Sequence, residues 1–235
     1  EGWMKGGNGN TVQSWMWKRH AGFDIVTYKG NGNNTDGANA HAHSLGKAPE
    51  MIWIKTRSGG SYSGVTHWTM SHKGLNGGTN PWQYTMSINL TNTEATTSNF
   101  GNTAPTSTHF YVGDPGNGRS NGNNSNYLAM LFASVDGISK VGYYNGSDSE
   151  QTITTGFQPR FLIIKNATTV EDWMVFDSIN GNWGSGNDTY LKLNTNDSSF
   201  TNYDYGAPTS TGFTLTGNNS GHNNAGDKYI YYAHA

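Results

Sequence analysis

The segment Leu45-Gly-Lys-Ala-Pro-Glu-Met-Ile-Trp-Ile-Lys55 returns later in the chain as Gly156-Phe-Gln-Pro-Arg-Phe-Leu-Ile-Ile-Lys165. Each copy carries a continuous apolar run, Met51–Ile54 in the first and Phe161–Ile164 in the second, shortly after a proline. A short apolar run between turn residues is typical of a strand that is buried on both faces. The two runs therefore predict the central strands of two related β-sheets.

Other matches on either side keep the same order along the chain. They pair 22–28 with 137–143, 67–70 with 172–175, 84–89 with 190–194, 104–110 with 207–213, and 127–133 with 229–235. Low complexity produces matching Gly and Asn tracts, but it does not produce Pro, Trp and Tyr anchors in a conserved order. The chain is therefore an internal repeat, and we assign one module to residues 22–135 and a second to 136–235.

Residues 1–21 match the end of a module, because the segment 10–17 stands where the closing strand stands one copy later. We interpret this segment as the closing strand of a preceding module, or as a strand that pairs with a sheet of this chain or of a neighbouring subunit. A bare strand edge tends to aggregate, so such a strand is expected to find a partner.

The composition indicates a folded all-β protein. Of 235 residues, 33% are hydrophobic, 13% aromatic and only 13% charged, and the net charge is −2. Disordered chains lack aromatic residues, whereas short apolar runs between Gly and Asn clusters are typical of sandwiches. We predict two tandem β-sandwich, jelly-roll-like modules with an extra N-terminal strand.

The same numbers exclude several classes of partner. The 14 Lys and Arg residues are scattered, so no basic stripe is available for nucleic acid. No apolar stretch approaches the roughly 18 residues of a membrane span. The chain has no cysteine, which removes disulfides and thiolate-bound zinc. We therefore expect stability to come from packing and from homo-oligomerisation.

The segments from Trp15 to Gly32 and from His43 to Lys55 resemble a repeat family of bacteriophage virion proteins, especially tail fibres of phages of marine and cyanobacterial hosts. The resemblance continues through Trp68, residues 102–108, 127–133 and 172–178, and so covers essentially the whole chain. It implies a β-sandwich module of a surface appendage, often trimeric, that contacts other virion proteins and the host envelope. It carries over no binding residue.

Two similar loops place aromatic residues among Gly and Asn. Trp82 and Tyr84 belong to the first loop, and Trp183 and Tyr190 to the second. Aromatic faces beside amide side chains suit a saccharide, so these four residues are candidate ligand contacts. The alternative is that each Trp caps the core of its own module, and its recurrence in both copies favours that alternative.

Metal sites are the other candidates. His41 and His43 lie two apart, so they share one face of an extended strand, and copies around a threefold axis would form a transition-metal site. The favoured alternative is two solvated side chains. The Asp-bearing loops 113–117 and 222–227 offer oxygen ligands for Ca²⁺, but neither matches an EF-hand, and ordinary turns are the favoured alternative. We expect no cofactor.

No carboxylate pair or nucleophile recurs in both copies, and no nucleophile elbow is present. We therefore expect a non-enzymatic virion appendage segment, located on the virion surface or outside the cell, with contact to host-surface glycan. Two alternatives stay open. One is a self-assembling filament subunit that donates residues 10–17 to a neighbour's sheet, and the other is a polysaccharide-degrading enzyme.

Overall fold

The computed structural model describes residues 22–59, 67–179, 181, 183–184 and 186–235, and this part of the chain is all-β. The strand predicted at 10–17 lies outside the described residues. The described residues contain no helix that is long and apolar enough to cross a membrane.

Module 1 contains one large and one small sheet. The large antiparallel sheet has the order β1-β8-β3-β4-β5-β6, and β2 pairs with β7 in the small sheet. The bounds are β1 Phe23–Lys29, β2 Ala40–Ala42, β3 Met51–Gly59, β4 Thr69–His72, β5 Tyr84–Ser87, β6 Ala95–Thr96, β7 His109–Tyr111 and β8 Ser125–Phe132, with short 3-10 helices η1 at Leu75–Gly78 and η2 at Pro81–Gln83.

Module 2 repeats this strand order as β9-β17-β11-β12-β13-β14, opposite a small sheet β10-β16-β15. The bounds are β9 Ser139–Asn145, β10 Gln151–Thr154, β11 Phe161–Asn166, β12 Met174–Asp177, β13 Asp188–Lys192, β14 Phe200–Tyr203, β15 Pro208–Thr209, β16 Gly212–Leu215 and β17 Lys228–His234. The chain is therefore two similar β-sandwich modules. Between β8 and β9 lies a linker, residues 133–138, which contains the predicted boundary.

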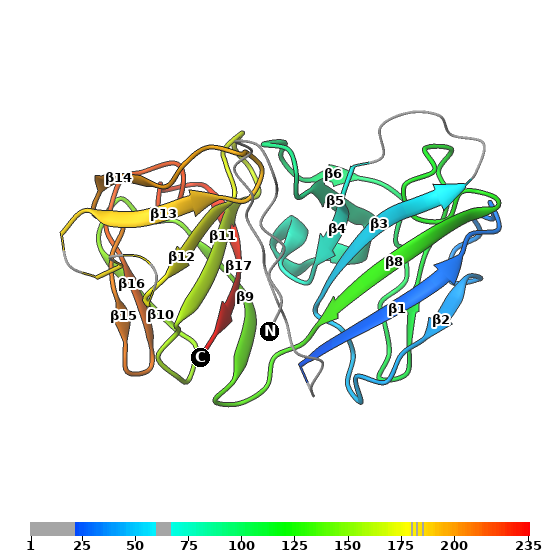
Figure 1. The fold of residues 1–235 in the computed structure, drawn as a ribbon, viewed down its shortest axis with the longest axis horizontal. Coiled ribbons are helices and arrows are strands. Elements are labelled where there is room, and N and C mark those ends of the chain that lie inside the picture. Colours follow the sequence, from blue (N-terminus) through cyan, green and yellow to red (C-terminus); the bar gives the residue numbers. More distant parts are fainter. Residues whose placement is uncertain (1–21, 60–66, 180, 182, 185) are drawn as a thin grey trace, which may run out of the picture.

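The two large sheets face each other, and the two small sheets lie on the outside (Figure 1). Alternation along the central strands explains why they are apolar on both sides. On β3, Ile52 and Ile54 enter the core of module 1, whereas Trp53 enters the core between the large sheets. On β11, Ile164 enters the core of module 2 and Ile163 the shared core. The prediction of two doubly buried central strands is confirmed.

The strand register corrects one of the sequence matches by one residue. Tyr28 on β1 is paired with Tyr127, and in module 2 the residue paired with Tyr229 is Tyr144, not Tyr143. A slip of one residue moves a side chain to the opposite face. Accordingly, Tyr144 is 8% exposed in the core of module 2, whereas Tyr143 is 48% exposed on the face that looks toward module 1.

A second match was wrong for the same reason. Met70 is paired with Met86, and its counterpart Val175 is paired with Leu191. Tyr84 lies two residues before Met86, so its counterpart lies two residues before Leu191. That residue is Thr189 and not Tyr190. The two tyrosines lie on opposite faces of their sheets, with Tyr84 against the shared core and Tyr190 inside module 2.

Candidate functional site

The structure places both candidate tryptophans in the cores of their own modules. Trp82 is 8% exposed and lies near Phe100, and Trp183 is 7% exposed with its ring centroid 5.6 Å from that of Phe176. Their aromatic area is used in packing, which is the alternative that the sequence favoured.

The two candidate tyrosines do not join them. Tyr190 is buried in the core of module 2, and Tyr84 is half-buried at the shared core. The four predicted ligand contacts therefore do not meet at one site.

His41 and His43 share one face of an extended segment, and both side chains are half-buried. The ring of His41 lies 4.1 Å from that of Tyr28, and His43 lies within hydrogen-bond distance of Thr106 and Leu45. Burial lowers the pKa of both imidazoles. Within the described ranges no three His, Cys, Asp or Glu side chains are grouped closely enough to hold a metal ion.

The two Asp-bearing loops use their carboxylates to accept protein hydrogen bonds. Asp114 accepts from the N–H groups of Gly116 and Gly118. Asp227 accepts from the hydroxyls of Thr168 and Thr169 and from two asparagine amides. Hydrogen-bond donors surround both carboxylates, and this is the geometry of closed turns rather than of an oxygen cage for Ca²⁺.

The loops that precede the last strand of each module carry a network that the sequence did not reveal. We call residues 118–124 and 220–226 the closing loops. In module 1, the hydroxyl of Tyr127 accepts from Gly122 N and donates to Gly118 O, both at 2.7 Å. In module 2, Tyr229 makes the same two bonds with Asn224 N and Ser220 O at 3.0 Å.

One buried asparagine completes each closing loop. Asn121 accepts from Asn31 N and donates to the carbonyl of Asn33. Asn223 accepts from Ser147 N at 2.8 Å and donates to the carbonyl of Ser149 at 2.9 Å. Buried amide groups that are fully hydrogen-bonded fix a unique loop conformation. The Asn-rich closing loops are therefore ordered parts of the scaffold.

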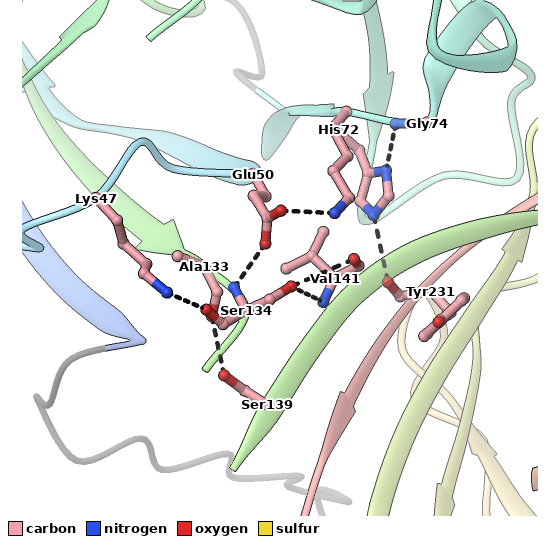
Figure 2. Close-up of polar contacts among 10 residues, drawn as sticks. Lys47, Glu50, His72, Gly74, Ala133, Ser134, Ser139, Val141 and Tyr231 are labelled. Atoms are coloured by element: carbon pink, nitrogen blue, oxygen red, sulfur yellow. Dashed lines mark hydrogen bonds and ion pairs between the residues drawn. The ribbon is translucent and has the colours of Figure 1, made fainter. Parts of the chain in front are cut away.

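Several polar side chains meet at the connection between the modules, which we call the module junction (Figure 2). Glu50, just before β3, accepts from the backbone N–H of Ser134 at 2.6 Å and from Lys73 Nζ at 2.6 Å. Burial alone would raise the pKa of Glu50, but the hydrogen bonds from Lys73 and Ser134 outweigh it and hold the pKa below its usual value. Glu50 is therefore an ionised anchor for the linker.

Further bonds fasten both ends of the linker. Lys47 donates to the carbonyl of Ser134 at 2.7 Å, and the Ser139 hydroxyl donates to the carbonyl of Ala133 at 2.9 Å. The hydroxyl of Ser134 accepts from Val141 N at 3.0 Å, on the first strand of module 2. Val135 N, in the linker, donates to the carbonyl of Ser139, the first residue of β9, at 2.9 Å. The linker is a hydrogen-bonded turn rather than a flexible tether.

His72 bridges the modules directly. Its Nδ1 accepts from Gly74 N at 2.9 Å, so Nε2 carries the proton and donates to the carbonyl of Tyr231 in module 2 at 3.3 Å (Figure 2). The side chain has no solvent exposure, and burial lowers its pKa to about 3. His72 is therefore a neutral bridge at any moderate pH.

Contacts beyond the linker extend the module junction across the facing sheets. The indole N–H of Trp173 donates to the carbonyl of Ser87 at 3.1 Å, and Glu94 N donates to the carbonyl of Ala167 at 2.8 Å. The ring of Phe132 lies 5.1 Å from that of Tyr232. The ionisable groups of the junction serve the structure, because hydrogen bonds engage both oxygens of the Glu50 carboxylate and both nitrogens of the His72 ring.

Residues 3–235 match the profile of a family described as "Domain of unknown function (DUF7483)". No curated protein and no solved structure matches the chain.

Proposed function

The chain belongs to the DUF7483 family, and we propose that it acts as a non-enzymatic structural segment of a virion appendage such as a tail fibre, with contact to host-surface glycan. One observation carries the structural part of this proposal. The two modules are joined by a shared apolar core and a hydrogen-bonded linker, so they form one stiff unit. The appendage itself is proposed from the resemblance to phage repeats.

The stiffness follows from the kind of contact between the modules. Domains that move relative to each other usually meet through small polar interfaces. Here the facing sheets contribute large buried side chains, among them Trp53, Phe132, Trp173 and Tyr232, and each has at most 4% exposure. A shaft or blade transmits load only if its modules keep a fixed angle, and this interface supplies that property.

Small-angle scattering on the purified chain tests the stiff unit. The expected curve fits a single conformation of the two modules at low and high salt alike. A matched variant, Glu50→Ala with Lys47→Ala, removes the two side chains that hold Ser134, and we expect it to widen the distribution of inter-module distances. A wild-type curve that requires an ensemble of angles would contradict the proposal.

Two further measurements test the role. Size-exclusion chromatography with light scattering is expected to show a homo-oligomer, and a glycan array is expected to show binding. Incubation with capsular or exopolysaccharide is expected to leave its viscosity unchanged. A loss of viscosity would support a polysaccharide-degrading enzyme instead, and open-ended polymers in electron micrographs would support the filament alternative.

A further inference from the structure

The small sheet of module 1 turns one phenol ring and one imidazole ring to the outside of the molecule, where Figure 1 shows β2. Along β7, Phe110 enters the core of module 1, so its neighbours His109 and Tyr111 point to the opposite face of the sheet. The register places Ala42 opposite His109 and Ala40 opposite Tyr111. Side chains that face each other in this way have their Cβ atoms about 5 Å apart. We call this surface of two rings beside two methyl groups the ring face.

Both rings carry polar atoms that the protein does not use. The side chains of His109 and Tyr111 are half-buried, and Ala40 and Ala42 are exposed. The Nδ1 atom of His109 lies 2.9 Å from the hydroxyl of Thr108. Within the described ranges, the Nε2 atom of His109 and the hydroxyl of Tyr111 have no hydrogen-bond partner. These two groups are therefore available to a ligand.

An ordered loop gives the ring face a polar border. The loop between β1 and β2 folds back on the loop between β6 and β7, because Gly37 N donates to the carbonyl of Gly101 at 3.0 Å. Beside this bond, Asn102 Nδ2 donates to Asp36 Oδ1 at 2.9 Å. Gly101 lies against the base of Tyr111, since a Cβ atom added to Gly101 would be 3.3 Å from Tyr111 Cβ. The Asp36 carboxylate keeps free acceptor capacity after one hydrogen bond.

Module 2 keeps the small sheet and lacks the ring face. Phe213 on β16 is buried as Phe110 is on β7, and β10 pairs with β16 as β2 pairs with β7. The residues that replace the four members of the ring face are Thr152, Thr154, Gly212 and Thr214. The loop before the sheet spans residues 30–39 in module 1 and only 146–150 in module 2. The fold of a module therefore requires neither the two rings nor the longer loop.

We infer that the ring face binds a neutral hexose residue of a host-surface polysaccharide. This inference rests on the proposed glycan contact and names its ligand class and its place. The carbon–hydrogen face of a pyranose ring packs on an aromatic ring such as that of Tyr111, and the small side chains of Ala40 and Ala42 leave room for the sugar. A few polar groups at the edge of such a surface fix the orientation of the ligand, and His109 and Asp36 supply them here.

The segments around the ring face select this ligand over others. In residues 32–43 and 98–111, Asp36 is the only charged side chain apart from the histidines. These segments therefore offer no lysine or arginine to pair with the carboxylate or sulfate groups of an acidic sugar. None of the exposed large hydrophobic residues of the described chain belongs to the ring face or to its border, whereas a protein–protein interface has an apolar centre.

The test measures how dextran and galactomannan, two neutral polysaccharides, retard the full chain in native gels that contain the polymer, with polygalacturonate as the acidic reference. We expect at least one neutral polymer to retard the wild-type chain. Tyr111→Ala is expected to lower the affinity at least about tenfold because the aromatic contact is lost, and Tyr111→Phe to keep most of it. Ala40→Gln fills the space opposite Tyr111 at an exposed position and is expected to weaken binding as well.

Tyr143→Ala is the matched control, because it removes a tyrosine that is 48% exposed on module 2, and it is expected to leave the affinity unchanged. Circular dichroism and the melting temperature verify that the variants are folded. The inference is overturned if neither neutral polymer retards the chain, if polygalacturonate retards it more than both, or if the control loses as much affinity as Tyr111→Ala.

Wild-type binding by both Tyr111→Ala and Ala40→Gln would also overturn the inference. In that case the glycan contact itself would stand and only its place would be wrong. No signal with any saccharide of the glycan array would remove the glycan contact and the ring face together. None of these results touches the stiffness measured by scattering, so the structural proposal stands or fails separately.

Discussion

Modules 1 and 2 have the same strand order and the same closing-loop bonds, yet the strand ends that correspond have different surroundings. In module 1, Glu50 and Lys73 are partly buried at the junction and lie 2.6 Å apart. In module 2, the corresponding end carries Arg160 and Asp177, which lie 3.6 Å apart with the arginine side chain half exposed. The duplicated parts define the fold of each module, and the parts that diverged define how the modules are joined.

The largest expected effect comes from replacing Phe132, which has no exposure and contacts Trp53, Phe23 and Tyr232 in the shared core. Phe132→Ala is expected to destabilise the chain by about 3–5 kcal/mol, the usual result of truncating a buried aromatic residue. The counterpart in module 2 is His234, which is half-buried at the chain end, and His234→Ala is expected to cost less than about 1 kcal/mol. Urea denaturation measures both, and similar losses would contradict the asymmetry of the junction.

The next prediction concerns what the modules share. Asn121→Ala and Asn223→Ala each remove a buried amide and leave backbone groups of the segment beside the closing loop, at residues 31–33 and 147–149, without these partners. We expect each to destabilise the protein by about 1–3 kcal/mol. The two losses should agree because the bonds are equivalent. A loss in only one module would show that the other closing loop is held by different contacts.

Lys165 and Lys55 are counterparts on β11 and β3, and they differ in burial. Lys165 has no exposure, and burial lowers its pKa to about 8. The unfolded chain keeps this proton up to a pH of about 10.5, so the cost of burying the charge is fully present below pH 8 and disappears as the pH rises through that range.

Lys165→Met is therefore expected to stabilise the protein by about 1–3 kcal/mol at pH 7 and to change little above pH 10.5. Lys55→Met is the matched control, with a smaller expected gain because Lys55 is half-buried. Chemical denaturation at pH 7 and at alkaline pH measures both gains. Destabilisation by Lys165→Met at pH 7 would mean that the buried ammonium group contributes a favourable interaction, such as its hydrogen bond to the carbonyl of Asn166.

The smallest effect, taken per pH unit, is expected on the slope with which the free energy of unfolding depends on pH. The unfolded chain binds a proton at His72 near pH 6.5, whereas the folded chain binds it only near pH 3. The contribution of the neutral ring is fully present above pH 6.5 and is lost as the pH falls toward 3. We expect His72→Gln, which keeps a donor for Tyr231, to reduce the slope of stability against pH by about 1.4 kcal/mol per pH unit in that window. An unchanged slope would assign the acid sensitivity to other groups, such as His222, whose pKa is also lowered, to about 4.

Much of the fold could be predicted from the sequence, because apolar runs and ordered anchors report burial directly. The sequence did not show which individual tyrosines correspond in the two modules. Tyr143 and Tyr144 are adjacent and chemically identical, so only the register shows which of them occupies the core.

The module junction was not predictable at all from the repeat. A comparison of the two copies emphasises what they share, and Glu50, Lys73 and His72 correspond to Arg160, Ser178 and Asp177, which do not match them in type. The closing-loop asparagines were hidden for another reason. Asn121 and Asn223 stand among many other asparagines, and burial, which distinguishes them, has no signature in composition.

The back-to-back arrangement of the large sheets also determines valency. Because the small sheets lie on opposite outer sides (Figure 1), equivalent points on them face away from each other, and a flat surface can touch only one at a time. Two weak contacts of the same kind on one chain would therefore not reinforce each other on a single cell by raising the effective concentration. They would instead bridge two surfaces, and avidity toward one surface would have to come from additional copies of the chain set side by side.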